Sequence, residues 1–173
     1  MAKILGIDPG SRITGYGIIS SVGNKLEYID AGCIRAESLA LPDRLKTIFD
    51  GLCTVIEQHT PQQAAIEEVF MGRNVSSALK LGQARGSAIT ACLYHDLQVE
   101  EYSARKVKQA VAGSGSADKR QVQHMVKALL SINVNIAEDA ADALAVAICH
   151  VNTQTSLIRM AGAKSFSRKR LRK

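Results

Sequence analysis

Residues 3–11 read KILGIDPGS, and the rest of the chain can be placed from this stretch. Residues 3–7 have the apolar character of a buried strand, which ends on one carboxylate, Asp8. The Pro-Gly pair that follows stops the strand, because proline cannot donate to a sheet ladder and glycine relaxes the turn. A second β run, residues 14–19, comes next, so the pattern predicts a hairpin. Asp8 either serves chemistry at a rigid strand tip or caps the turn, and this stretch alone favours the turn cap.

The composition is that of a globular chain. Its 173 residues fit one domain with a sizeable core, and the hydrophobic share of 46% and charged share of 22% are ordinary. No apolar run is long enough to cross a bilayer and the first residues do not resemble a signal peptide, so we expect no membrane association. The four cysteines are scattered among apolar neighbours without zinc-ligand spacing, which predicts reduced core residues and a cytoplasmic protein.

The net charge of +6 is unevenly distributed. Residues 71–127 hold nine Lys/Arg against four Asp/Glu, and residues 164–173 hold six Lys/Arg and no acid. This pattern fits a polyanion that lies on a basic surface with carboxylates set into it, while a solvated face plus an unstructured tail is the simpler alternative. An aromatic content of 4% without tryptophan argues against a single-strand binder built on base stacking.

The first half of the chain predicts an open sheet. Residues 25–34 form a third strand paired to the second, and apolar residues at helical spacing predict a helix over 41–59. Residues 64–70 form a fourth strand, which should run parallel to the first because a helix connects it to the earlier strands. Its acids Glu67 and Glu68 point to opposite faces of the sheet. Only one of them can face the acid of the first strand, and the alternation does not decide which.

Two glycines mark the next helix, which we expect to be capped by Ser76 or Ser77 and to run to about residue 94. Gly82 and Gly86 stand four apart and so share one face. Because glycine destabilises a helix, a packing reason is expected. The spacing leaves open whether this face of the helix packs internally, against the sheet, or against a second subunit across a dimer axis.

Two helices in the second half carry cations. A short strand, residues 99–102, is followed by Ser103, which can cap a helix containing Lys108. The segment Gly113-Ser114-Gly115-Ser116 then breaks the chain, and Lys119 lies in the first turn of the next helix. Free N–H groups at a helix start with nearby cations suit a phosphate, although an ordinary connection between helices gives the same pattern.

The last strong helix pattern covers residues 138–150. Asp139 and Asp142 are three apart and share a face, which continues through the apolar Val146 and Cys149. Carboxylates at the head of a core-facing stripe are costly unless something positive meets them. Asp139 also suits a helix N-terminus, which favours negative charge, whereas Asp142 lies one turn further in.

Four acids can therefore meet at one place: Asp8, one glutamate of the fourth strand, Asp139 and Asp142. Carboxylates brought close repel one another and burial adds to the cost, so their pKa values should be raised without metal. A hard divalent cation relieves this, which predicts Mg²⁺ with Mn²⁺ able to substitute. Two ions about 3.5–4 Å apart can activate a water and stabilise the leaving oxygen in phosphodiester hydrolysis.

Five motifs follow one another in the chain: Gly6-Ile7-Asp8-Pro9-Gly10-Ser11, Thr14-Gly15-Tyr16-Gly17, Ile66-Glu67-Glu68-Val69-Phe70, Leu81-Gly82-Gln83-Ala84-Arg85-Gly86 and Asp139-Ala140-Ala141-Asp142-Ala143-Leu144. In their order and spacing, across about residues 3–150, the sequence resembles the RuvC Holliday-junction resolvases. The resemblance implies an α/β, ribonuclease-H-like fold with a five-stranded mixed sheet flanked by helices. We expect this nuclease domain to span residues 1–155, and residues 156–173 to form a flexible basic tail.

The resemblance also implies residue roles, and it selects Glu67 over Glu68. The implied metal-binding catalytic acids are Asp8, Glu67, Asp139 and Asp142. The implied DNA-contacting residues are Lys108, Lys119 and the aromatic Phe70, to which we add Arg73, the cation of the same loop as Phe70.

The implied activity is metal-dependent nicking of two symmetry-related strands of a four-way DNA junction, with the RuvA–RuvB branch-migration complex as partner. Two cuts related by a two-fold axis call for an isologous homodimer, and this favours the helix with Gly82 and Gly86 as a subunit interface.

Other functions fit parts of the same pattern. An RNA–DNA hybrid nuclease of the same fold would prefer a hybrid over a four-way junction. A non-catalytic junction-binding module would lose no activity on Asp8→Asn. An actin-like ATPase is disfavoured because a second nucleotide-binding domain does not fit in this length.

Overall fold

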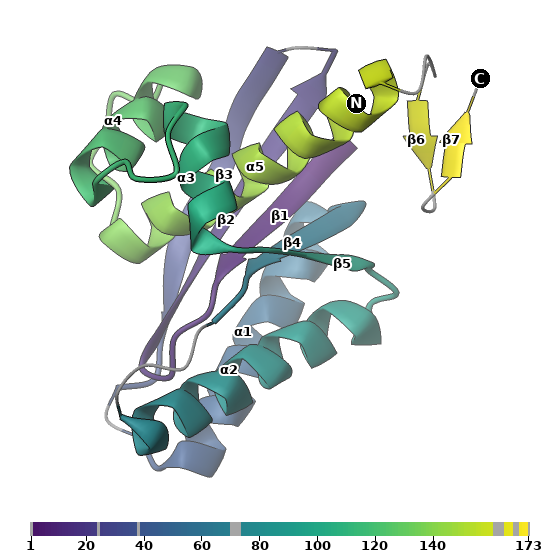
Figure 1. Ribbon diagram of the computed structural model, residues 1–173. Coiled ribbons are helices and arrows are strands. Elements are labelled where there is room, and N and C mark those ends of the chain that lie inside the picture. The colour runs from purple at the N-terminus through teal and green to yellow at the C-terminus, as the bar shows by residue number, and fades with distance from the viewer. Residues whose placement is uncertain are drawn as a thin grey trace.

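The computed structural model describes residues 2–23, 25–37, 39–69, 74–160, 165–167 and 170–172. It shows a five-stranded mixed sheet with helices packed on both faces (Figure 1). Its elements follow in this order: β1 (Ala2–Asp8), β2 (Ile13–Val22), β3 (Lys25–Arg35), α1 (Leu41–His59), β4 (Gln63–Glu67), α2 (Val75–Tyr94), β5 (Val99–Tyr102), α3 (Ala104–Ala112), α4 (Lys119–Leu129), α5 (Glu138–Met160), β6 (Ser165–Ser167) and β7 (Arg170–Arg172).

The strand β1 lies at the centre of the sheet, whose order is β3-β2-β1-β4-β5. It pairs antiparallel with β2, as the hairpin pattern predicts, and parallel with β4 across the α1 connection. The ladder between β1 and β4 runs from the pair Ile4–Gln63 to the pair Ile7–Ile66. The predicted five-stranded mixed sheet is therefore confirmed, and β1 and β4 end side by side.

Two apolar cores lie on opposite faces of this sheet. On one face α5 crosses the strands and is flanked by α3 and α4, and the core there includes Ile4, Ala65 and Leu144 (Figure 1). On the other face α1 and α2 pack against residues such as Leu5 and Ile66. Successive residues of β1 and of β4 thus alternate between the two cores, as side chains of a central strand must.

Three glycines let α5 lie directly on the sheet. A Cβ placed on Gly6 would come within 2.1 Å of the Ala143 carbonyl oxygen, and one on Gly15 within 2.0 Å of the Asp139 carbonyl oxygen. A Cβ on Gly17 would meet the side chain of Leu144 at 2.7 Å. Because a side chain on any of the three strand positions would displace the helix, glycine fixes the depth at which α5 is seated.

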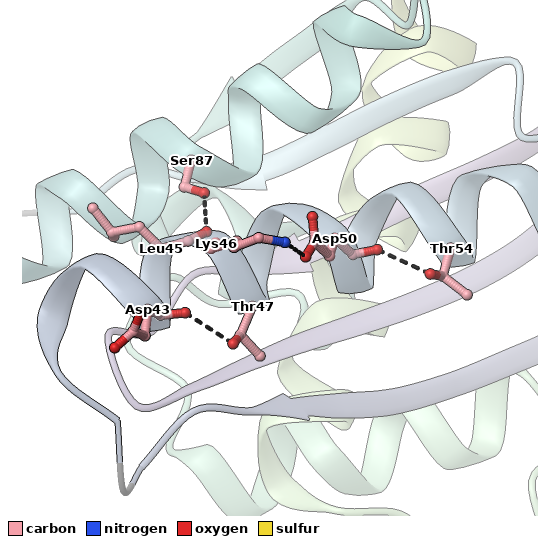
Figure 2. Close-up of polar contacts among 7 residues, drawn as sticks. All are labelled: Asp43, Leu45, Lys46, Thr47, Asp50, Thr54 and Ser87. Atoms are coloured by element: carbon pink, nitrogen blue, oxygen red, sulfur yellow. Dashed lines mark hydrogen bonds and ion pairs between the residues drawn. The ribbon is translucent and has the colours of Figure 1, made fainter.

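Figure 2 shows a hydrogen bond that joins α1 to α2 on the opposite face, together with polar contacts within α1. The Ser87 hydroxyl of α2 donates a hydrogen bond to the Leu45 carbonyl of α1 at 2.7 Å. On the surface of α1, Lys46 and Asp50 form an ion pair four residues apart, a spacing that supports a helix. The Ser87 hydrogen bond and the apolar core on this face seat one side of α2 on α1, and the other side of α2 is exposed.

Several boundaries differ from the sequence prediction. The strand β4 ends at Glu67, whereas the prediction continued it to Phe70, which lies outside the described residues. The predicted serine cap of α2 is wrong: Asn74 is the N-cap, and its side chain accepts a hydrogen bond from the Ser77 backbone N–H at 3.1 Å. The helix α5 runs on to Met160, ten residues past the predicted pattern and through residue 155.

Two further expectations concern reduced cysteines and the lack of a membrane-spanning segment. Cys33, Cys53, Cys92 and Cys149 are all free thiols, and Cys92 and Cys149 are buried, as core residues should be. Within the described ranges, none of the helices combines the length and apolar character that a bilayer-spanning segment needs.

Candidate active site

Asp8 and Glu67 lie side by side at the ends of β1 and β4. The last pair of their ladder is Ile7 with Ile66, so the following residue of each strand stands beside the other. Ala65, two residues before Glu67, packs in the core under α5, so Glu67 shares that face by alternation. The structure therefore places Glu67 on the α5 face beside Asp8, a choice that the sequence alternation left open.

Asp139 and Asp142 reach the same edge of the sheet from the first turns of α5. Their placement depends on the glycines beneath the helix: Gly15 of β2 lies against the Asp139 backbone and Gly6 of β1 against Ala143. Both acids are half-buried, and the residues that follow each of them on α5 are buried in the core. The N-terminal end of α5 thus stands over the tips of β1 and β4.

The charges of these acids act on one another. The pKa of Asp8 is raised to about 8, first by burial and then by the negative charges of Glu67, Asp142 and Asp139. Burial followed by the charge of Asp142 also raises the pKa of Glu67. Burial raises the pKa of Asp142 as well, against the opposing effect of a nearby lysine. Such mutual repulsion arises only among carboxylates that stand close together.

Two lysines face this cluster. Lys119, at the first position of α4, places its ammonium 3.0 Å from an Asp142 carboxylate oxygen and also pairs with Glu138. Lys108 on α3 is half-buried, and its charge lowers the pKa of Glu67. A pocket of roughly 170 Å³ lies between β4, α3, α4 and α5, and its lining includes Glu67, Asp142 and both lysines.

The four acids are close enough to shift one another's pKa values, but their side chains are not arranged to coordinate a metal ion. In the described part of the chain, no group of three or more His, Cys, Asp or Glu side chains is arranged to hold a metal ion. A positive charge is nevertheless already present there, because the Lys119 ammonium lies against Asp142. The donor set consists of carboxylate oxygens, the chemistry that Mg²⁺ and Mn²⁺ prefer, so the residues fit such an ion once the ammonium moves.

The other predicted site residues lie elsewhere. Phe70 and Arg73 fall outside the described residues. Gly82 and Gly86 are exposed on α2, where a Cβ on either glycine would meet nothing within 4 Å. The packing partner predicted for these two glycines is therefore not within the described part of this subunit.

Sequence reasoning missed two features of the site. Glu138 pairs with Lys119 and so extends the acidic cluster by one residue. Gly15 and Gly17 seat the helix that carries Asp139, and a signal for this was available, since glycines at alternate positions of a strand indicate close approach of another backbone.

A mixed sheet of this order, with carboxylates at adjacent strand tips beneath a helix, defines a ribonuclease-H-like nuclease. The family model described as "Crossover junction endodeoxyribonuclease RuvC" matches residues 4–150. The chain belongs to this RuvC family.

Relatives and a solved structure agree with this assignment. The chain is 58% identical over 172 residues to the crossover junction endodeoxyribonuclease RuvC of Saccharophagus degradans, with 99% of each chain covered. It is 60% identical over 169 residues to the protein of the same name from Photobacterium profundum, covering 98% of each. The structure of T. thermophilus RuvC in complex with a Holliday junction substrate superposes with a TM-score of 0.84 at 30% identity, covering 96% of this chain and 100% of that one.

Proposed function

We propose that this protein is a structure-selective endonuclease that resolves four-way DNA junctions in recombination and repair. It hydrolyses phosphodiester bonds in two symmetry-related strands with the help of a divalent cation. Relatives at 58% and 60% identity carry the name crossover junction endodeoxyribonuclease, and the similar T. thermophilus protein was solved with a Holliday junction. The similarity covers nearly the whole chain, so the activity is proposed for the whole chain.

One observation carries the proposal: Asp139 and Asp142, at the start of α5, lie over the tips of β1 and β4, where Asp8 and Glu67 stand side by side. The crowding, together with burial, raises the pKa of Asp8 to about 8. At neutral pH such a cluster is unfavourable unless a cation meets it. Asp8, Glu67, Asp139 and Asp142 would hold two Mg²⁺ ions, with Mn²⁺ able to substitute. Bound there, these ions supply an activated water and stabilisation of the leaving oxygen.

The chain's own residues supply the rest of the mechanism. Lys108 and Lys119 line the pocket beside Glu67 and Asp142, where each can neutralise a backbone phosphate of the DNA. The sheet holds Asp8 and Glu67 rigidly, and the glycine-seated helix α5 holds Asp139 and Asp142 over them. Phe70 and Arg73 remain predictions for the contact with the junction.

A homodimer follows from the symmetry of the substrate, and α2 offers the surface for it. Its exposed side carries Val75 and Leu79, with 66% and 64% of their surface exposed, followed by Gly82 and Gly86. These residues fall three or four apart and share one face. Two copies of such a face allow close approach about a two-fold axis.

The remaining assignments extend this proposal. Four free cysteines suit a reducing compartment, so we place the protein in the cytoplasm. The basic tail, residues 156–173, and the RuvA–RuvB complex as partner stay predictions from the sequence and its resemblance.

The proposal is tested by cleavage of a synthetic four-way junction in Mg²⁺, beside a linear duplex and an RNA–DNA hybrid. We expect paired symmetric nicks in the junction, the same nicks in Mn²⁺, and none in EDTA. The Asp8→Asn variant should bind the junction without cutting it. Preferred cleavage of the hybrid would support the related hybrid nuclease instead, and junction binding without cleavage by the wild type would indicate a binding module.

A further inference from the structure

The positive charge of Lys119 is unfavourable at the start of its own helix, α4, and favourable beside the acids at the start of α5. Lys119 occupies the first position of α4, where the positive end of the helix dipole disfavours a cation. Its ammonium instead crosses to the start of α5, where it contacts both Asp142 and Glu138. The base of the side chain is fixed, because Asp118 and Gln121 form a reciprocal capping box at the start of α4.

The two carboxylates that receive Lys119 need a cation between them. Glu138 and Asp142 stand four residues apart on α5, a spacing at which like charges face each other and repel. Burial works to lower the pKa of Lys119, but the bonds to Glu138 and Asp142 outweigh burial and raise this pKa overall. The lysine thus bridges a pair of acids, one of which is a candidate metal ligand.

The ion pairs of Lys119 with Glu138 and Asp142 are exposed enough to be displaced. Lys119 and Glu138 have 52% and 59% of their side-chain surface exposed, against 22% for Asp142. Ion pairs with this much exposure contribute little to stability, because water screens the two charges. A phosphate group or a divalent cation can therefore displace the ammonium without unfolding either helix.

We propose that Glu138 is a positioning residue that latches the Lys119 ammonium against Asp142 in the DNA-free protein, where the ammonium competes with a divalent cation for that carboxylate. This inference rests on the proposed function. A DNA phosphate that draws Lys119 away uncovers Asp142, so substrate binding increases the affinity of the site for the metal ion. The latch thereby restrains metal loading in the absence of DNA.

The part played by Glu138 is tested by NMR of lysine ammonium groups in the full-length, metal-free protein. The Lys119 signal should persist in the wild type because the ion pairs slow exchange with water, and Glu138→Gln should broaden or abolish it. Asp118→Asn is the matched control, since it removes the same charge next to Lys119 while asparagine still caps α4. Glu138→Asp should restore the signal. An unchanged signal in Glu138→Gln, or equal loss in the control, overturns the assignment of Glu138.

The competition is tested by calorimetric titration with Mg²⁺ in the absence of DNA. Lys119→Met should tighten Mg²⁺ binding by about two- to fivefold, the range expected for releasing a half-exposed ion pair. Lys108→Met is the control, because Lys108 lines the same pocket but makes no ion pair within the described part of the chain. Equal tightening of Mg²⁺ binding in the two variants would show that removal of any nearby positive charge has this effect. That result would overturn the proposed role of the Lys119 ion pairs and leave the proposed function standing. A wild type that neither binds Mg²⁺ nor cuts a junction would overturn the proposed function itself.

Discussion

Glycines lie under α5 in crowded surroundings and on α2 in open surroundings. Gly6 and Gly15 lie beneath α5, where an added Cβ would stand about 2 Å from a backbone oxygen. Gly82 and Gly86 lie on α2, and among the residues that the structure describes nothing lies within 4 Å of an added Cβ on either of them. The first pair is required by packing inside the subunit, whereas the second pair weakens its helix without any contact that explains it there.

This contrast separates the two halves of the proposed function. The glycines under α5 set the height of Asp139 and Asp142 above the strand tips, and in the proposed function they serve the chemistry. In the proposed homodimer, the glycines on α2 would keep a face flat for the second subunit and so serve the symmetry of the two cuts. Substitutions at these glycines and at Asp8 therefore test each half separately.

Gly6→Ala should have the largest effect on stability. The new Cβ would meet the Ala143 carbonyl oxygen and the Ala147 backbone nitrogen at 2.1 and 2.8 Å, so α5 must shift along its length. Overpacking of this kind costs about 3 kcal/mol of unfolding free energy. Urea denaturation at fixed protein concentration measures it, with Gly82→Ala as the control that should lose nothing. Equal stability of the two variants would mean that α5 is not seated by Gly6.

Gly15→Ala should act on cleavage more than on junction binding. Its Cβ would push against the Asp139 backbone at the head of α5, which moves an acid by a fraction of an ångström to an ångström. A misplacement of about 1 Å costs about 100-fold in rate. We therefore expect kcat on a four-way junction to fall about 100-fold while the Kd for the junction changes little. Full retention of kcat would contradict the role of Gly15 in positioning Asp139.

Much of the fold could be predicted from the sequence because its signals are local. The helix over 41–59 and the strand over 99–102 were placed at their observed ends by apolar spacing, an N-terminal proline and turn residues. The predicted serine cap of α2 is wrong because Asn74, Ser76 and Ser77 lie within four residues and all three side chains suit an N-cap. The full length of α5 was missed because the ten residues beyond 150 lack a strong apolar stripe.

The site was only partly accessible to the same reasoning. The spacing of Asp139 and Asp142 showed a shared helix face, but the choice between Glu67 and Glu68 depended on which core Ala65 joins, and that is a tertiary fact. The pairing of Lys119 with Glu138 joins residues 19 positions apart on different helices, and local patterns do not reveal such a contact.

Asp8→Asn should stabilise the metal-free protein at neutral pH. The folded-state pKa of about 8 lies above the unfolded value of 3.8, so protonation of Asp8 favours the fold. This stabilisation is complete below pH 3.8 and is lost as the pH rises through 8. Asparagine resembles the protonated acid, and we expect a gain of roughly 1–2 kcal/mol at pH 7–8 that fades toward pH 4.

Thermal melts in EDTA between pH 4 and 9 measure this gain, with Asp118→Asn as a control at an exposed acid. A lower melting temperature for Asp8→Asn at pH 8 would argue against crowding among the four carboxylates. Added Mg²⁺ should raise the melting temperature of the wild type but not that of Asp8→Asn.

Gly86→Leu should change the fold least, because open space surrounds that position. Replacing a helical glycine even favours the helix by roughly 0.5–1 kcal/mol. The expected effect is on assembly: analytical ultracentrifugation should find the variant monomeric and junction cleavage should lose its paired symmetric nicks. A variant that stays fully dimeric and active would exclude Gly86 from the interface.

In the proposed function, Asp8, Glu67, Asp139 and Asp142 gather around a divalent cation at the tips of β1 and β4. Anomalous scattering from crystals of the protein with Mn²⁺ and a four-way junction tests this arrangement. We predict a Mn²⁺ peak at about 2.0–2.3 Å from oxygens of Asp8 and Glu67, with an α5 acid completing the site and Lys119 turned away from Asp142. A Mn²⁺ ion bound away from these carboxylates, or none bound while the junction is still cut, would contradict the account.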